Sequence, residues 1–191
     1  MLDHSRFEEQ LKMKEWQPLK LEEISEDTKK VNDILNKESD LACVLIGTSY
    51  LAELLASIIE VSFIKSSVSG KLLDPQRGAL GGFATRTDLA YCLGLINKNV
   101  YQDLIKVAEI RNMFAHSHLA LDFGDITVRE ACDRLQAWRI LLHGEHEKLP
   151  AEPTPKQMQM RARNQFNISV ALIGSRIHLN ALSKREQSKK P

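Results

Sequence analysis

The chain contains a long apolar stretch, LACVLIGTSYLAELLASIIEVSFI at residues 41–64, that could span a lipid bilayer by its length. Two glutamates, Glu53 and Glu60, lie inside this stretch. An acidic side chain near the centre of a membrane helix costs about 2.5–3.5 kcal/mol. Residues seven apart share one face of an α-helix. We therefore predict a buried helix with one polar edge, and no membrane anchor.

Apolar residues recur at helical spacing through most of the remaining chain, and no segment shows the alternation of a half-buried strand. Residues 65–82 hold four glycines and a proline and are predicted to form the main loop. Thr127 with Glu130, and Thr154 with Gln157, have the spacing of helix N-terminal caps. The sequence predicts an all-α, single-domain bundle of about six helices, over residues of about 19–36, 39–64, 83–96, 99–116, 127–143 and from 154 onward.

The composition, 43% hydrophobic and 27% charged over 191 residues, is typical of a globular protein and excludes collagen-like and wholly disordered chains. A net charge of +1 argues against a surface coated with basic side chains for nucleic acid. Three widely spaced cysteines, Cys43, Cys92 and Cys132, are interpreted as small buried hydrophobic residues in a reducing compartment. The charged N-terminus shows no secretory signal, so we expect a cytoplasmic protein.

Charge is distributed unevenly along the chain. Residues 156–191 contain eight lysines and arginines and a single acid, Glu186, which gives +7. Residues 1–155 contain 18 basic and 24 acidic side chains, which gives −6. The basic side chains either keep an apolar helix soluble or bind phosphate groups. The candidates for phosphate contacts are Arg161, Arg163, Lys184 and Arg185.

The same features divide the chain into four predicted segments. A charged helical segment comes first and a helical core follows, and three prolines at residues 150–155 separate this core from the C-terminal helix. That last helix is expected to pack on the core or on a partner, and a disordered basic tail ends the chain. The predicted boundaries are 1–38, 39–149, 150–180 and 181–191.

The segment EIRNMFAH, residues 109–116, places Arg111, Asn112 and His116 close together in sequence. Arginine supplies a permanent forked cation that suits phosphate, and histidine moves protons near neutral pH. Such a pair can cleave RNA without a metal, because a base activates the 2′-hydroxyl and arginine stabilises the developing charge. On an ideal helix Arg111 and His116 lie roughly 140° apart. They could converge if the helix ends near His116 or if two subunits share the site.

A purely structural role for these charges is an open alternative. Arg86 could form a buried ion-pair network with Glu53, Asp88 and Glu109 that fixes the helix register. Asn112 and His116 would then only terminate a helix. The histidine pairs lack the spacing of a closed zinc site, so we expect no metal and no cofactor.

The arrangement of Arg111, Asn112 and His116 is similar to the R-x4-6-H signature of the HEPN superfamily. Members of that superfamily are all-helical, usually dimeric, and many are ribonucleases. The resemblance implies that Arg111 and His116 are catalytic and that Asn112 supports them.

A longer resemblance covers most of residues 40–145 and is strongest in residues 78–116, GALGGFATRTDLAYCLGLINKNVYQDLIKVAEIRNMFAH. This block resembles that of the mannitol operon repressor (MtlR/MltR) family, as does the order of a long apolar helix followed by a Gly/Pro loop. The resemblance implies an all-α protein that represses carbohydrate-uptake genes. The family has no obvious helix-turn-helix, so the resemblance implies repression through a protein partner. The matching positions are Gly78-x-Leu80-Gly81, Arg86, Leu89, the run Tyr91-x-Leu93-Gly94-Leu95-Ile96-Asn97, and Tyr101.

The sequence therefore supports two hypotheses about function. The leading one is a regulator that works through protein contacts and is not an enzyme, because its resemblance covers more of the chain. The alternative is a metal-independent ribonuclease that acts on RNA through Arg111 and His116. Both hypotheses predict a homodimer, and neither requires a membrane.

Overall fold

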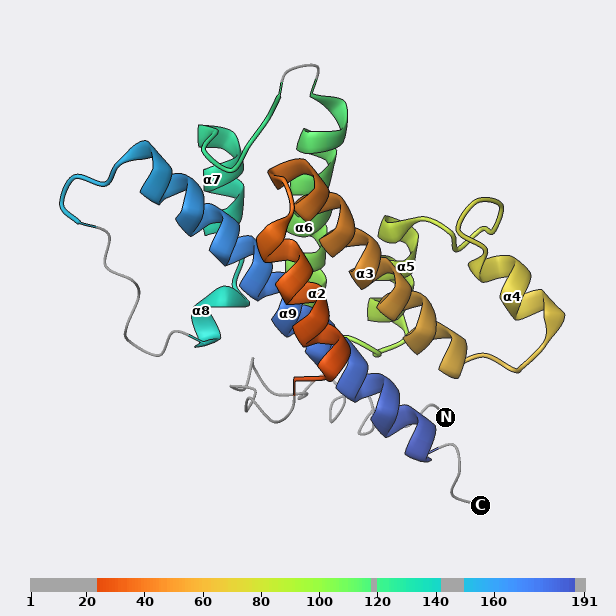
Figure 1. Ribbon diagram of the computed structural model, residues 1–191. Helices are drawn as coiled ribbons and strands as arrows, with labels where there is room; N and C mark the ends of the chain where they lie inside the picture. The colour runs from red at the N-terminus through yellow and green to blue at the C-terminus, as the bar shows by residue number, and fades with distance from the viewer. Residues whose placement is uncertain (1–23, 118–119, 142–149, 188–191) are drawn as a thin grey trace.

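The computed structural model describes residues 24–117, 120–141 and 150–187, and these residues form helices without any strand (Figure 1). The all-α prediction is confirmed. Each of the six predicted helices has a counterpart among the described residues, the predicted helix 127–143 is broken into α7 and α8, and α4 is an additional short helix. The helices are α2 (Glu26–Lys37), α3 (Asp40–Val61), α4 (Ser67–Leu73), α5 (Phe83–Cys92), α6 (Lys98–His116), α7 (Ile126–Asp133), α8 (Trp138–Leu141) and α9 (Pro155–Gln187).

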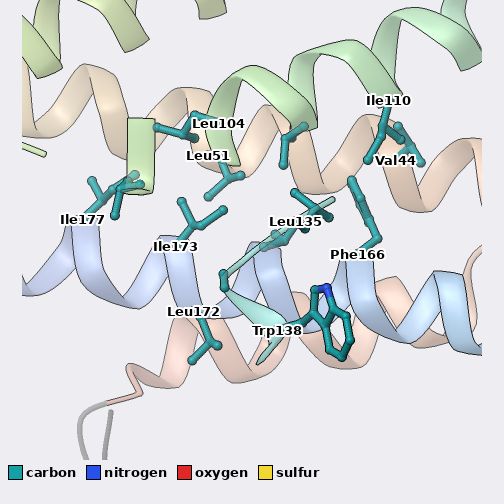
Figure 2. Packing of buried hydrophobic residues seen from close by; sticks show 14 of the residues in the cluster. Val44, Leu51, Leu104, Ile110, Leu135, Trp138, Phe166, Leu172, Ile173 and Ile177 are labelled. Atoms are coloured by element: carbon teal, nitrogen blue, oxygen red, sulfur yellow. The ribbon is translucent and has the colours of Figure 1, made fainter. Parts of the chain in front are cut away.

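Helix α9 runs across the bundle and contacts α2, α3, α6, α7 and α8 (Figure 1). Three of its apolar side chains, Phe166, Ile173 and Ile177, have no exposed surface. Figure 2 shows Ile173 facing Leu51 of α3, and Phe166 facing Val44 of α3 and Ile110 of α6. Burying each such side chain contributes about 1.5–3 kcal/mol to stability. Helix α9 therefore joins α2 and α3 to α6, α7 and α8.

Helix α3 is formed by most of the apolar stretch at residues 41–64. Ser39 caps it by accepting a hydrogen bond from the Ala42 amide at 3.3 Å. Leu51 and Leu55 are fully buried, whereas Glu53 and Glu60 are exposed. The prediction of a buried helix with one polar edge is confirmed. Among the described residues α3 is the one helix long and apolar enough to cross a membrane, and 44% of that apolar window is buried in the bundle.

Some predicted boundaries were wrong. The predicted loop 65–82 contains α4, which begins with a capping box between Ser66 and Ser69. Helix α7 is capped by Asp125, whose carboxylate accepts from the Thr127 amide at 2.9 Å, and it ends at Asp133 instead of continuing to 143. The Thr154–Gln157 cap is confirmed, because the Gln157 amide donates to the Thr154 hydroxyl at 3.3 Å.

The C-terminal end of the chain also differs from the prediction. Helix α9 continues to Gln187, so residues 181–187 extend a helix that packs on the bundle instead of starting a disordered tail. Residues 188–191 of the predicted tail, and residues 1–23 of the predicted first segment, lie outside the described residues. Cys43 and Cys132 are buried as predicted, whereas Cys92 is exposed.

Candidate functional sites

Arg86 of α5 is buried and its guanidinium group binds three backbone carbonyls. Nε donates to Leu80 at 2.7 Å, Nη1 to Ala52 at 3.0 Å, and Nη2 to Leu73 at 2.6 Å. Burial lowers the pKa of Arg86, and the carbonyl dipoles supply the polar environment that a carboxylate would otherwise provide. Arg86 therefore connects α3, the end of α4 and the following loop.

The predicted ion-pair network around Arg86 is not brought together. Glu53 is exposed, and Asp88 accepts a hydrogen bond from the Tyr101 hydroxyl at 3.1 Å, which raises the pKa of Tyr101. Glu109 lies 3.9 Å from Arg134, and both side chains are about half exposed. No ion pair among the described residues joins Arg86 to any of these acids, because the three carbonyls occupy its guanidinium group.

The block that carries the longer resemblance builds the scaffold around Arg86. A Cβ atom on Gly78 would lie 2.3 Å from the Leu72 carbonyl oxygen, and one on Gly81 would lie 2.5 Å from the Asp74 oxygen. Only glycine fits where backbone approaches backbone so closely. The stacked rings of Tyr91 and Tyr101, with centroids 4.6 Å apart, join α5 to α6. Gly78, Gly81, Tyr91 and Tyr101 therefore each have a role in maintaining the fold of a single chain.

The proposed ribonuclease residues lie on the last turns of α6. Arg111, Asn112 and His116 are all exposed, and Arg111 Nη1 donates to Asn112 Oδ1 at 3.0 Å. The helix ends at His116, as convergence would require. Nevertheless, no hydrogen bond in the described part of the chain joins Arg111 to His116. In a single chain all three side chains are therefore exposed to solvent, and the hydrogen bond within this group joins Arg111 to Asn112.

The predicted phosphate contacts divide into internal and surface groups. Arg163 is internal: Nη1 pairs with Asp40 Oδ1 at 2.5 Å, and Nη2 donates to the carbonyls of Leu35 and Glu38. Arg163 is therefore a structural residue rather than a phosphate ligand. Arg161 lies 3.9 Å from Asp133 on the surface.

The remaining two candidates lie near the end of α9. Arg185 donates to the Ser57 hydroxyl at 3.3 Å, and Lys184 is half-buried beside it. These contacts fix part of each side chain against the bundle, so the C-terminal charge is less free than a basic tail would be.

Sequence analysis missed a fully buried acid, Asp103 of α6. Its carboxylate accepts from the amides of Gln136 at 2.9 Å and Ala137 at 2.7 Å, and from Lys106 Nζ at 3.2 Å. Burial raises the pKa of Asp103. Asp103 stands three residues after the buried Val100, on the apolar face of the helix, and this position in the pattern could have identified it.

The hollows lined by the described residues include two that are open to a ligand or a partner side chain. The larger, about 660 Å³, lies where α3, the α3–α4 turn and the end of α9 meet. Glu60, Val61, Phe63, Lys65, Ser66, Ser69 and Arg185 line it. The smaller, about 160 Å³, lies between α7 and α9. Neither includes Arg111 or His116, and no group of three His, Cys, Asp or Glu side chains that could hold a metal occurs among the described residues.

A sequence model of the mannitol repressor family (MtlR) matches residues 27–180. The chain belongs to the mannitol repressor family. The match includes residues 78–116, so the resemblance identified from sequence is confirmed. No curated protein matches the chain.

Among solved structures the fold is similar to a chain in the X-ray structure of the MtlR-HPr complex from Escherichia coli, with a TM-score of 0.63. The two sequences are 21% identical, and the match covers 78% of this chain and 97% of the other. At this identity the similarity shows that the two chains share a fold. The relative in that structure is bound to a second protein.

Proposed function

We propose that this member of the mannitol repressor family is a transcriptional regulator that represses carbohydrate-uptake genes mainly through contacts with a protein partner. The observation that carries the proposal is the shared fold with an MtlR chain that was solved in complex with HPr. We further propose that the chain acts in the cytoplasm as a homodimer. Sedimentation velocity of the purified chain tests the dimer, and cell fractionation tests the location.

The surface of the bundle supports a role in protein binding. Large apolar side chains are exposed on α2 and on the first turns of α3, where Ile34, Leu41 and Leu45 face solvent. Exposed apolar side chains that gather in one place mark interaction sites more often than chance. In contrast, Arg163, one of the four candidates for phosphate contacts, is used inside the fold.

Isothermal titration of the purified chain with HPr from the same organism tests the proposal. The expected result is saturable binding of HPr. In a strain from which the gene for this protein is deleted, transcripts of carbohydrate-uptake genes are expected to rise. A folded chain that gives no heat with HPr at high micromolar concentration, together with unchanged transcripts, would reject the proposed function.

The exposed cluster at the end of α6 supports a second candidate function, a metal-independent ribonuclease. Arg111 donates a hydrogen bond to Asn112, and His116 is the last residue of the helix. Labelled RNA in EDTA is incubated with the wild-type chain and with His116→Ala and Arg111→Ala. Cleavage that both folded variants lose would support the ribonuclease, and intact RNA with the wild-type chain would exclude it under these conditions.

A further inference from the structure

Residues 62–82, here named the α4 arm, stand at the edge of the bundle and join it beside the end of α3 (Figure 1). The inner face of α4 carries Ser69, which is buried, and Leu73, which packs against the core. The outer face carries Val68 and Leu72, which are 59% and 37% exposed, and Ile64 just before the helix is 88% exposed. The arm therefore presents large apolar side chains that the other described residues leave exposed.

The arm is held in a fixed position. Arg86 binds the Leu73 and Leu80 carbonyls at its base, and the Leu80 amide donates to the Leu72 carbonyl at 2.8 Å. Asp74 Oδ1 accepts from the amides of the two residues that follow Pro75, at 2.9 and 2.8 Å. A surface that is already ordered loses little conformational entropy when a partner binds. An ordered arm is therefore expected to bind a partner more tightly than a flexible loop with the same side chains.

The charge of the arm differs from that of the chain around it. The arm contains three basic side chains, Lys65, Lys71 and Arg77, and one acid, Asp74, and the three basic ones are exposed. The arm therefore carries +2, whereas the rest of the chain carries −1, because the whole chain carries +1. Asp74 is occupied by the two amides of its own turn. A positive apolar surface complements an acidic apolar partner.

The hollow of about 660 Å³ lies on the inner side of the arm, where Ser66 and Ser69 line it. Lys65 and Arg185 line it together with Phe63, and Glu60 is the one acid in its wall. A side chain of a partner protein fits a hollow of this kind, whereas a bilayer surface has no such projection. The hollow therefore favours a protein partner over a membrane.

We propose that the α4 arm is a docking surface for an acidic amphipathic helix of a partner protein. The apolar face of that helix packs on Val68 and Leu72, and its acidic side chains pair with Lys65 and Lys71. This inference rests on the proposed function, because it assigns a surface to the partner contacts. It names the chemistry of the helix that binds, and it makes no claim about where HPr binds.

The probe is a labelled synthetic helix with leucines on one face and glutamates elsewhere, titrated against the full chain and followed by fluorescence anisotropy. Two further probes are the same helix with lysines in place of the glutamates, and vesicles of phosphatidylcholine with 30% phosphatidylserine. Val68→Asp removes part of the apolar face, and Lys71→Glu reverses one charge. Ile126→Asp on α7 is the matched control, because Ile126 is 60% exposed and Val68 is 59% exposed.

The expected result is saturable binding of the acidic helix that weakens at least tenfold in Val68→Asp and in Lys71→Glu and is unchanged in Ile126→Asp. Absence of saturable binding, equal binding of the lysine helix, equal loss in Ile126→Asp, or binding of vesicles alone would each overturn the inference. HPr is titrated in parallel. HPr binding without helix binding rejects only the docking surface, and helix binding without HPr binding counts only against the HPr part of the proposed function.

Discussion

The base of the α4 arm and the outer face of the same arm use charged and apolar residues in opposite ways. At the base the cation of Arg86 is buried and satisfied by backbone carbonyls, while on the outer face Lys71 and Leu72 are exposed to solvent. A buried charge is retained only where the fold supplies partners, whereas an exposed apolar side chain on a rigid arm contributes little to folding. The difference indicates that the buried charges specify the structure and that the exposed face is available for a partner.

The largest effect is expected where a buried charge is removed. Asp103→Ala leaves the amides of Gln136 and Ala137 and the Lys106 ammonium group without their common acceptor. Removing one partner of a buried charged pair costs about 3–5 kcal/mol, and this loss is expected in urea unfolding. Glu53→Ala on the exposed edge of α3 is the control and is expected to change stability by no more than about 0.5 kcal/mol. Equal small effects in both variants would contradict the structural role of Asp103.

A pair of glycines within the arm should change stability in opposite directions. Gly78→Ala places a Cβ 2.3 Å from the Leu72 carbonyl oxygen, and such overpacking costs about 1–3 kcal/mol. Gly70→Ala in α4 meets no atom within 4 Å and gains helix propensity, up to about 1 kcal/mol. Thermal unfolding of both variants measures the difference. A destabilised Gly70→Ala would show that α4 packs more tightly than its exposure indicates.

The smallest effect concerns the thiols, and it compares the surface with the interior directly. Burial raises the pKa of Cys43 to about 12, and the Cys43 thiol donates to Asn167 at 3.0 Å. Burial also raises the pKa of Cys132, whereas Cys92 is exposed. Because the thiolate is the reactive form, we expect one thiol per native chain to react with Ellman's reagent at pH 8, and three after unfolding. Rapid reaction of Cys43 in the native chain would contradict its burial.

The long helices could be predicted from sequence because their caps and apolar periodicity lie within a few residues of one another. Ser39 caps α3 and Asn97 caps α6 where the pattern indicates a start. In contrast, α4 was missed because a seven-residue helix that contains Gly70 has little propensity of its own. Its position depends on Arg86, which lies 13 residues beyond Leu73 in sequence.

The candidate sites were harder to predict, for a related physical reason. The sequence shows charges but not backbone carbonyls that converge in space, so Arg86 was assigned to carboxylates and Arg163 to phosphate. Arg86 binds three carbonyls instead, and Arg163 binds two carbonyls and the Asp40 carboxylate. Arg111, Asn112 and His116 are exposed in one chain, and their ribonuclease role stays a prediction.

The central claim is that the buried residues at the base maintain the fold and that the outer face of the α4 arm binds a partner. The most direct test measures two quantities, the free energy of unfolding and the affinity for the acidic helix, on Leu72→Asp and on Gly78→Ala. We predict that Leu72→Asp keeps wild-type stability within about 0.5 kcal/mol and loses at least tenfold in affinity, while Gly78→Ala is destabilised. Leu72→Asp that binds the acidic helix as tightly as the wild-type chain would contradict the account.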